Sequence, residues 1–261
     1  MDLGVNDKVY FLAASTRGLG RAVAHELKES GASVFLGGRD EETLLQTLKE
    51  MGADQDRKVH GAVLDASSAD SIEKWIEEGL HTFGRMDGFL VNAGGPPAGK
   101  FKDFDDSDFD AAYQLTLMSA VRMIRESLPA LRGSKGNIVI VTSLSVREPV
   151  DNLILSNVFR SGVNALMKTL SRELIDDGIR TNCIAPGLIS TDRLEKIEKS
   201  TAEATGKNQN EVRKEMQAGI PMHRYGDPSE FGRVGAFLLS PAASYINGES
   251  IQVDGGLAKG V

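Results

Sequence analysis

The chain has 261 residues, of which 41% are hydrophobic and 26% charged, enough to build one large α/β core. Its formal net charge is −7 and no basic block stands out, which argues against nucleic acid or a membrane surface as a partner and favours small-molecule ligands. No run approaches the roughly 18 apolar residues of a membrane span, and the single cysteine, Cys183, has no partner for an intramolecular disulfide. We therefore expect a cytoplasmic protein without a bound metal, with Cys183 packed in its core.

Residues 8–27 carry the first recognisable unit, a short apolar run followed by a glycine turn and an amphipathic helix. Backbone N–H groups at such a turn are free, and the helix dipole directs positive charge to the same place, so the turn suits a phosphate. The turn contains Gly18 and Gly20, but Ala14 stands where a glycine is usual. Taken alone, these residues are compatible with an ordinary loop as well as with a dinucleotide site.

Strands and helices then alternate along the chain. After a strand at 9–12, apolar runs predict six more at 33–36, 59–64, 88–91, 138–141, 182–185 and 250–253. Apolar residues at helical spacing predict helices between these strands. One helix ends near Gly52, and the later helices cover about 68–80, 107–131, 156–177 and 228–239. This alternation predicts a single α/β domain over 1–261, a Rossmann-type doubly wound seven-stranded parallel sheet with helices on both faces.

Four polar or turn residues follow predicted strands, namely Asp65, Asn92, Ser143 and Pro186. Ligands of doubly wound sheets bind beyond the carboxyl ends of the strands, so we expect these residues to share one cleft with the glycine turn. The charged, helix-prone segment 191–219 is long for a connection inside a compact domain. We interpret it as a lid over the substrate end of the cleft.

The motifs in this order resemble those of the short-chain dehydrogenase/reductase family over essentially the whole chain. The match lies in STRGLG at 15–20, Asp65, Asn92-Ala93-Gly94, Pro186-Gly187 with Thr191, and INGESIQVDGG at 246–256. The resemblance implies an oxidoreductase that interconverts a carbonyl and an alcohol with a nicotinamide cofactor. Many members are 3-oxoacyl-carrier-protein reductases or sugar and steroid dehydrogenases, and homodimers or homotetramers built on the two long helices are usual.

The resemblance also implies which residues bind the cofactor. They are Ala14, Thr16, Arg17, Gly18, Leu19, Gly20, Arg39, Asp65, Ala66, Asn92, Ala93, Gly94, Arg160, Pro186, Gly187, Ile189 and Thr191. An NAD-specific site places an acid at the end of the second strand to bind the ribose 2′-hydroxyl, whereas this chain has Gly38 followed by Arg39. Together with Arg17, this substitution predicts that NADP(H) is preferred and that NAD(H) is possible.

The chain departs from the family at the reacting groups. Ser143 matches the catalytic serine, but Ser156 and Arg160 replace the Tyr-x-x-x-Lys pair, and Thr116 aligns with the additional asparagine. The family's tyrosine donates a proton to the carbonyl oxygen because a lysine lowers its pKa, whereas serine is a far weaker acid and arginine keeps its proton at ordinary pH. We expect these four residues to form the catalytic set, with a water held by the two serines and polarised by Arg160 as an altered proton relay.

Three interpretations remain open at this stage. The first is an NADP(H)-dependent oxidoreductase whose substrate, possibly of 3-oxoacyl type, is anionic because Arg147 and Arg160 flank the site. The second, favoured by the joint loss of Tyr and Lys, is a catalytically impaired dinucleotide-binding protein with a regulatory or assembly role. The third is a lyase or epimerase on the same scaffold. His223 and Tyr225, just beyond the predicted lid, are candidate substitute proton donors.

Overall fold

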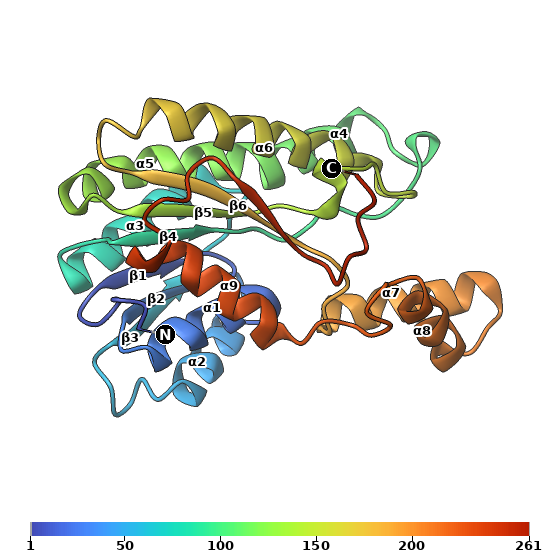
Figure 1. Cartoon of the computed structure of the whole chain (residues 1–261), viewed down its shortest axis with the longest axis horizontal. Helices are drawn as coiled ribbons and strands as arrows, with labels where there is room; N and C mark the ends of the chain where they lie inside the picture. The colour runs from blue at the N-terminus through green and yellow to red at the C-terminus, as the bar shows by residue number, and fades with distance from the viewer. Residues whose placement is uncertain (1, 261) are drawn as a thin grey trace.

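The computed structural model describes residues 2–260 and contains a seven-stranded sheet in the order β3-β2-β1-β4-β5-β6-β7 (Figure 1). The strands are β1 Val9–Leu12, β2 Ser33–Gly38, β3 Val59–Val63, β4 Gly88–Val91, β5 Asn137–Val141, β6 Arg180–Pro186 and β7 Ser250–Val253. All six neighbouring pairs run parallel. The Rossmann-type fold predicted from the sequence is therefore confirmed. The outermost ends of the predicted domain, Met1 and Val261, lie outside the described residues.

Helices cover both faces of this sheet (Figure 1). One face carries α1 Gly18–Glu29, α2 Glu41–Glu50 and α9 Pro228–Leu239. The other face carries α3 Ala69–Phe83, α5 Ser119–Ser134 and α6 Ile154–Glu173. Within residues 2–260, no helix is both long enough and apolar enough to cross a membrane.

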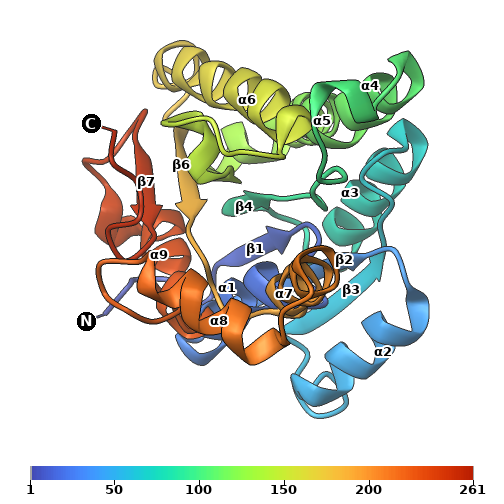
Figure 2. The same ribbon diagram turned by 90° about the vertical axis from the view of Figure 1, so that its right-hand side faces the viewer.

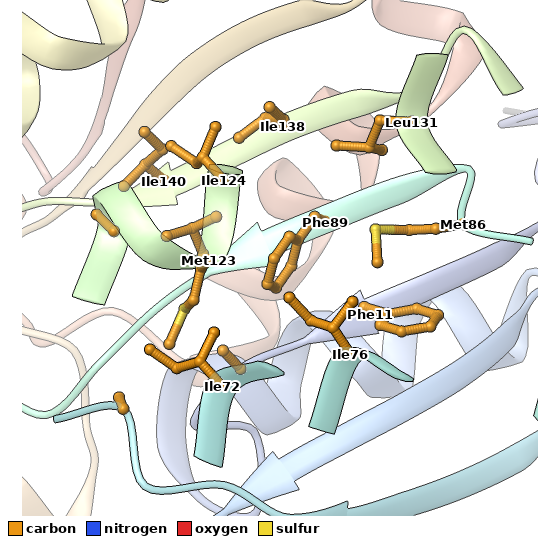
Figure 3. Packing of buried hydrophobic residues seen from close by; sticks show 14 of the residues in the cluster. Phe11, Ile72, Ile76, Met86, Phe89, Met123, Ile124, Leu131, Ile138 and Ile140 are labelled. Atoms are coloured by element: carbon orange, nitrogen blue, oxygen red, sulfur yellow. The ribbon is translucent and has the colours of Figure 1, made fainter. Parts of the chain in front are cut away.

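A hydrophobic cluster on each face fixes the sheet against its helices. Figure 3 shows the cluster between the sheet and α3 and α5, where Phe11 and Phe89 from the strands meet Ile76 and Met123 from the helices. Burying each such side chain contributes about 1.5–3 kcal/mol relative to leaving it in water. Trp75 is buried here too, and its indole N–H donates to the Leu36 carbonyl at 3.1 Å, as expected for a core residue.

The helix predicted over 107–131 proves to be three segments, so this prediction is wrong in detail. α4 Asp106–Tyr113 passes into a π-helical turn at Gln114–Met118, from which α5 continues to Ser134. A π turn inserts an extra residue into the helix, a local irregularity often found at functional sites. Pro129 lies inside α5 and does not end it. The turn places Thr116 in the protein interior, packed beside α6.

The segment 191–219 forms two helices, α7 Asp192–Thr205 and α8 Gln209–Ala218, which project beyond the sheet (Figure 1). The buried Glu198 of α7 ties them together by accepting hydrogen bonds from Arg213 of α8, at 3.0 Å from Nε and 2.8 Å from Nη2. The Arg213 hydrogen bond is the main reason that the pKa of Glu198 falls to about 2. We therefore treat α7 and α8 as one rigid hairpin.

Candidate active site

The glycine turn forms a cradle between β1 and α1. Ala14 adopts a φ of +47° and Gly18 a φ of +55°, a region that favours glycine, which explains why glycine is usual at the alanine position. A β-carbon at Gly20 would lie 2.5 Å from the Ala14 carbonyl oxygen. Arg17 is the N-cap of α1 and provides no side-chain cap, and the first turn contains no acid. The first N–H groups of α1 therefore stay available, so the turn fits a dinucleotide phosphate.

Two further loops meet this turn. Asn92, directly after β4, donates through Nδ2 to the Ala14 carbonyl at 3.2 Å, and so joins the Asn-Ala-Gly element to the glycine turn. From the other side, Thr191 Cγ2 lies 3.6 Å from the β-carbon position of Gly18. Gly187 follows β6 and approaches Asp254 closely, leaving no room for a side chain. The structure thus brings the three predicted loops together at the carboxyl ends of the strands.

The remaining cofactor-site candidates occupy the same edge of the sheet. Asp65 accepts hydrogen bonds from the Ser67 N–H at 2.9 Å and hydroxyl at 2.7 Å; these bonds, more than the nearby Arg39 charge, lower the pKa of its carboxyl. Ala66 and Ile189 are buried, whereas Leu19, Ala93 and Pro186 are half-buried and Gly94 is exposed.

Two guanidinium groups frame the end of β2, where the sequence predicts recognition of a 2′-phosphate. Arg17 is exposed and donates to Thr43 Oγ1 at 2.6 Å, near the N-terminus of α2. Arg39 is also exposed, on the side of Asp65. A β-carbon at Gly38 would overlap the Thr16 side chain, so glycine is required for this packing. Asp40, the residue after Arg39, caps α2 by accepting from the Thr43 N–H at 2.8 Å.

At the predicted catalytic end of the site, Arg160 is anchored to the end of β5. Its Nη1 donates to the Val141 carbonyl at 2.8 Å and to the Thr142 carbonyl at 3.2 Å, next to Ser143. Because a guanidinium has five N–H donors, these two bonds leave Nη2 and Nε for a ligand. Burial, followed by the positive charge of Arg193, lowers the pKa of Arg160 to about 10. The side chain therefore stays protonated at neutral pH and cannot act as a general base there.

The hydroxyl groups at this end come from three elements. Ser143 accepts a hydrogen bond from the Ser145 N–H at 3.2 Å and so caps the turn that follows β5. Ser156 is buried one helical turn before Arg160, on the same side of α6. Thr116 Oγ1 is buried in the π-helical turn and has no hydrogen-bond partner among residues 2–260. A buried hydroxyl without a partner is costly, so Thr116 retains the capacity to bind a water or a ligand.

Other candidates from the sequence lie outside this group. The hydroxyl of Tyr225 is buried beside Glu198 of the α7–α8 hairpin, where burial first, and then the Glu198 carboxylate, raise its pKa. It is therefore a weaker proton donor than a free phenol. His223 and Arg147 are exposed. Cys183 is fully buried in β6, and burial raises its pKa to about 12, which confirms that it is a core residue.

Sequence reasoning missed Arg193, the second residue of α7. Its guanidinium lies against Gly95, and a β-carbon at Gly95 would overlap it. The positive charge of Arg193 also helps to lower the pKa of Arg160. The sequence does contain a pattern that could have pointed to this contact: Arg193 comes two residues after Thr191, and a second glycine, Gly95, follows the Asn-Ala-Gly element.

The family model described as Enoyl-(Acyl carrier protein) reductase matches residues 13–258 of the chain. Dehydrogenase/reductase SDR family member 4 of Oryctolagus cuniculus is 31% identical over 253 residues, covering 96% of this chain and 93% of that protein. The chain therefore belongs to the short-chain dehydrogenase/reductase family, as its motifs predict, and this places it among the oxidoreductases.

Two solved structures are similar over almost their whole length. L-Sorbose reductase from Gluconobacter frateurii, complexed with NADPH and L-sorbose, superposes with a TM-score of 0.95 at 28% identity, covering 100% of both chains. An NADPH-bound short chain oxidoreductase of Pseudomonas aeruginosa PAO1, described as containing an atypical catalytic center, gives a TM-score of 0.89 at 26% identity and covers 98% of this chain and 100% of its own.

Proposed function

We propose that the protein is an NADP(H)-dependent oxidoreductase that interconverts a carbonyl and an alcohol on an anionic substrate through an altered proton relay. The observation that carries this proposal is the position of Arg160, held at the end of β5 beside Ser143 with donors left for a ligand. The open cradle at Gly18 and Gly20 and the cations Arg17 and Arg39 support the preference for NADP(H). NADPH in both similar structures supports the same choice of cofactor.

In this proposal, Arg160, Ser143 and Ser156 have different roles in carbonyl reduction. NADPH, when bound, supplies the hydride that adds to the carbonyl carbon. The carbonyl oxygen gains negative charge as this bond forms, and the permanent charge of Arg160 stabilises it. The oxygen must then take up one proton, for which Ser143 and Ser156 hold a water that Arg160 polarises. Because this water is a weaker acid than an activated phenol, we expect it to be a slow donor for simple ketones.

Thr116 extends this relay in the proposal. Its unpartnered hydroxyl lies in the π-helical turn against α6, the helix that carries Ser156 and Arg160. A hydroxyl can donate and accept at once, so Thr116 can pass a proton between water molecules. Replacing Thr116 by Val, which has a similar shape, should slow reduction without changing NADPH affinity.

We also propose that the protein is a cytoplasmic homodimer or homotetramer. Aromatic side chains extend along the outer surface of α4 and α6, with Tyr113 and Phe159 ring centroids 6.0 Å apart and Phe109 and Phe159 centroids 6.3 Å apart. The adjoining Val158 is 47% exposed, so this surface has apolar area to bury. Light scattering after size exclusion measures the oligomeric state, and a monomer would contradict this part of the proposal.

One experiment separates this function from a binding protein without turnover. NADPH fluorescence is titrated with the purified chain, and NADPH oxidation is then followed with a panel of keto acids and ketones. We expect binding together with oxidation by keto acids. Binding without oxidation by any panel member would favour the regulatory or assembly role, and an absence of NADPH binding would contradict the proposed function.

A further inference from the structure

Arg193 and Arg160 are neighbouring cations, and among residues 2–260 neither forms an ion pair with a carboxylate. Arg160 uses only Nη1 within the protein, and Arg193 makes no hydrogen bond or ion pair with any residue in the described range 2–260. The charge of Arg193 helps to lower the pKa of Arg160, which means that the two groups repel each other. In a chain with a net charge of −7, a repelling cation pair is unusual unless an anion joins it.

The backbone keeps a place open for the second guanidinium. Gly95 follows the Asn-Ala-Gly element, and a β-carbon there would overlap the Arg193 guanidinium group. No such contact is made at Gly94, where an added β-carbon would meet nothing within 4 Å. Gly95 therefore seats Arg193, and the seat lies after β4 whereas Arg160 lies at the end of β5.

We propose that Arg193 and Arg160 together bind the anionic group of the substrate, a carboxylate or a phosphate, and that Arg193 thereby couples closure of the lid to recognition of charge. Guanidinium groups bind such anions through charge-assisted hydrogen bonds, and Nη2 and Nε of Arg160 are free, so one of them can donate to the anionic group while the other faces the reacting oxygen. This inference rests on the proposed oxidoreductase function and names the residues that select its substrate. Arg193 and Arg147 are both exposed, and Arg193, which lies against Gly95, takes the role predicted for Arg147.

The lid hairpin transmits this contact. Arg193 stands at the start of α7, which Figure 2 shows in front of the strand ends. The Glu198–Arg213 ion pair joins α7 to α8, so an anion held by Arg193 restrains both helices. An anionic oxygen of the cofactor has the same chemistry as a substrate carboxylate. Arg193 also lies near the phosphate cradle, since Thr191, two residues earlier, lies 3.6 Å from the β-carbon position of Gly18, and so NADPH affinity is measured beside substrate selectivity to separate the two sources.

The test compares acetoacetate with its neutral methyl ester in the full-length protein carrying NADPH. We expect the unaltered protein to prefer the acid in kcat/KM, and Arg193→Gln to reduce this acid-to-ester ratio about tenfold to a hundredfold, the effect of losing a charge-assisted hydrogen bond. Arg193→Lys should recover part of the ratio because it restores the charge without the fork. Gly95→Ala should also lower the acid-to-ester ratio although Arg160 and Arg193 both remain. The added β-carbon displaces the flexible Arg193 side chain and does not meet the backbone.

Lys196→Gln is the matched control, since it removes one exposed cation from the same helix and should leave the ratio unchanged. The NADPH dissociation constant distinguishes the two sources of the anion. If Arg193→Gln weakens NADPH binding tenfold and leaves the acid-to-ester ratio unchanged, the cofactor is the partner and the proposal is wrong.

A second readout does not depend on turnover. Hydrogen exchange in α7 is measured with NADP⁺ bound, with and without acetoacetate or the ester. We expect the acid to protect α7 in the unaltered protein and to lose this effect in Arg193→Gln. Equal protection by acid and ester, or by neither, would overturn the proposal even if NADPH binding and keto-acid reduction confirm the proposed function.

Discussion

The two ends of the candidate active site are built in different ways. At the dinucleotide end, the backbone makes the site: the positive φ angles of Ala14 and Gly18, the close approach at Gly20 and the open N-terminus of α1. At the reacting end, side chains make the site, and there Ser156 and Arg160 replace the family's Tyr and Lys. Because backbone atoms make the dinucleotide end, side-chain mutations at the reacting end should leave NADPH binding unchanged. NADPH affinity and the rate of carbonyl reduction should therefore respond separately to mutation.

The largest expected effect is at the dinucleotide end. In Gly20→Ala the new β-carbon would lie 2.5 Å from the Ala14 carbonyl oxygen and 2.9 Å from Ser15 Cα, so the backbone of the turn must shift. We expect the NADPH dissociation constant to rise about a hundredfold, or about 2.8 kcal/mol. Fluorescence titration measures it. Gly133→Ala is the control, because an added β-carbon there meets nothing within 4 Å. A folded Gly20→Ala protein with unchanged affinity would refute the role of the turn.

The second prediction concerns the reacting end. The double variant Ser156→Tyr with Arg160→Lys restores the family's donor pair, and we expect reduction of simple ketones to rise about tenfold to a hundredfold, within the usual range of acid–base assistance. NADPH affinity should stay within about twofold, because the cradle at the start of α1 includes neither Ser156 nor Arg160 and the variant keeps a cation at position 160. Steady-state kinetics and fluorescence titration on the same sample measure both quantities. A gain in affinity without a gain in rate would contradict the separation of the two ends.

The third prediction tests how the dinucleotide end selects its cofactor. Replacing both Arg17 and Arg39 by Ala should weaken NADPH binding about tenfold to a hundredfold relative to NADH, since each guanidinium provides a charge-assisted hydrogen bond to the 2′-phosphate. Isothermal titration with both cofactors gives the ratio. Arg57→Ala removes an exposed arginine before β3, away from the cleft, and should leave the ratio unchanged. Equal losses for both cofactors would show that the two residues do not recognise the 2′-phosphate.

The smallest expected effect is in the α7–α8 hairpin, the proposed lid. The pKa of Glu198 is lowered to about 2 from 4.5, so its contribution to stability is complete above pH 4.5 and is lost as the pH falls toward 2. Glu198→Gln should speed amide exchange in α7 and α8 at neutral pH by about tenfold, because Arg213 loses a charged partner. Glu203→Gln, an exposed change on the same helix, should have no effect. Unchanged exchange in Glu198→Gln would show that the pair does not hold the hairpin.

Periodicity predicted the central strands well because buried parallel strands such as β1 Val9–Leu12 and β4 Gly88–Val91 are continuous apolar runs, both located to the residue. The half-buried edge strand β7 Ser250–Val253 has alternating polar residues and was also located to the residue. The π-helical turn at Gln114–Met118 was missed, since one extra residue hardly changes the apolar pattern. Arg193 was missed because its role depends on a contact with Gly95, about a hundred residues away, that local spacing does not encode.

The separation of binding from chemistry is tested most directly on the unaltered protein, by measuring NADPH affinity and single-turnover hydride transfer to a simple ketone under one set of conditions. We predict clear NADPH binding together with turnover well below the typical enzyme value of about 10 per second. Rapid reduction of simple ketones would reveal a proton donor other than Ser143, Ser156 and Arg160. An absence of NADPH binding would contradict the proposed dinucleotide site at the glycine turn.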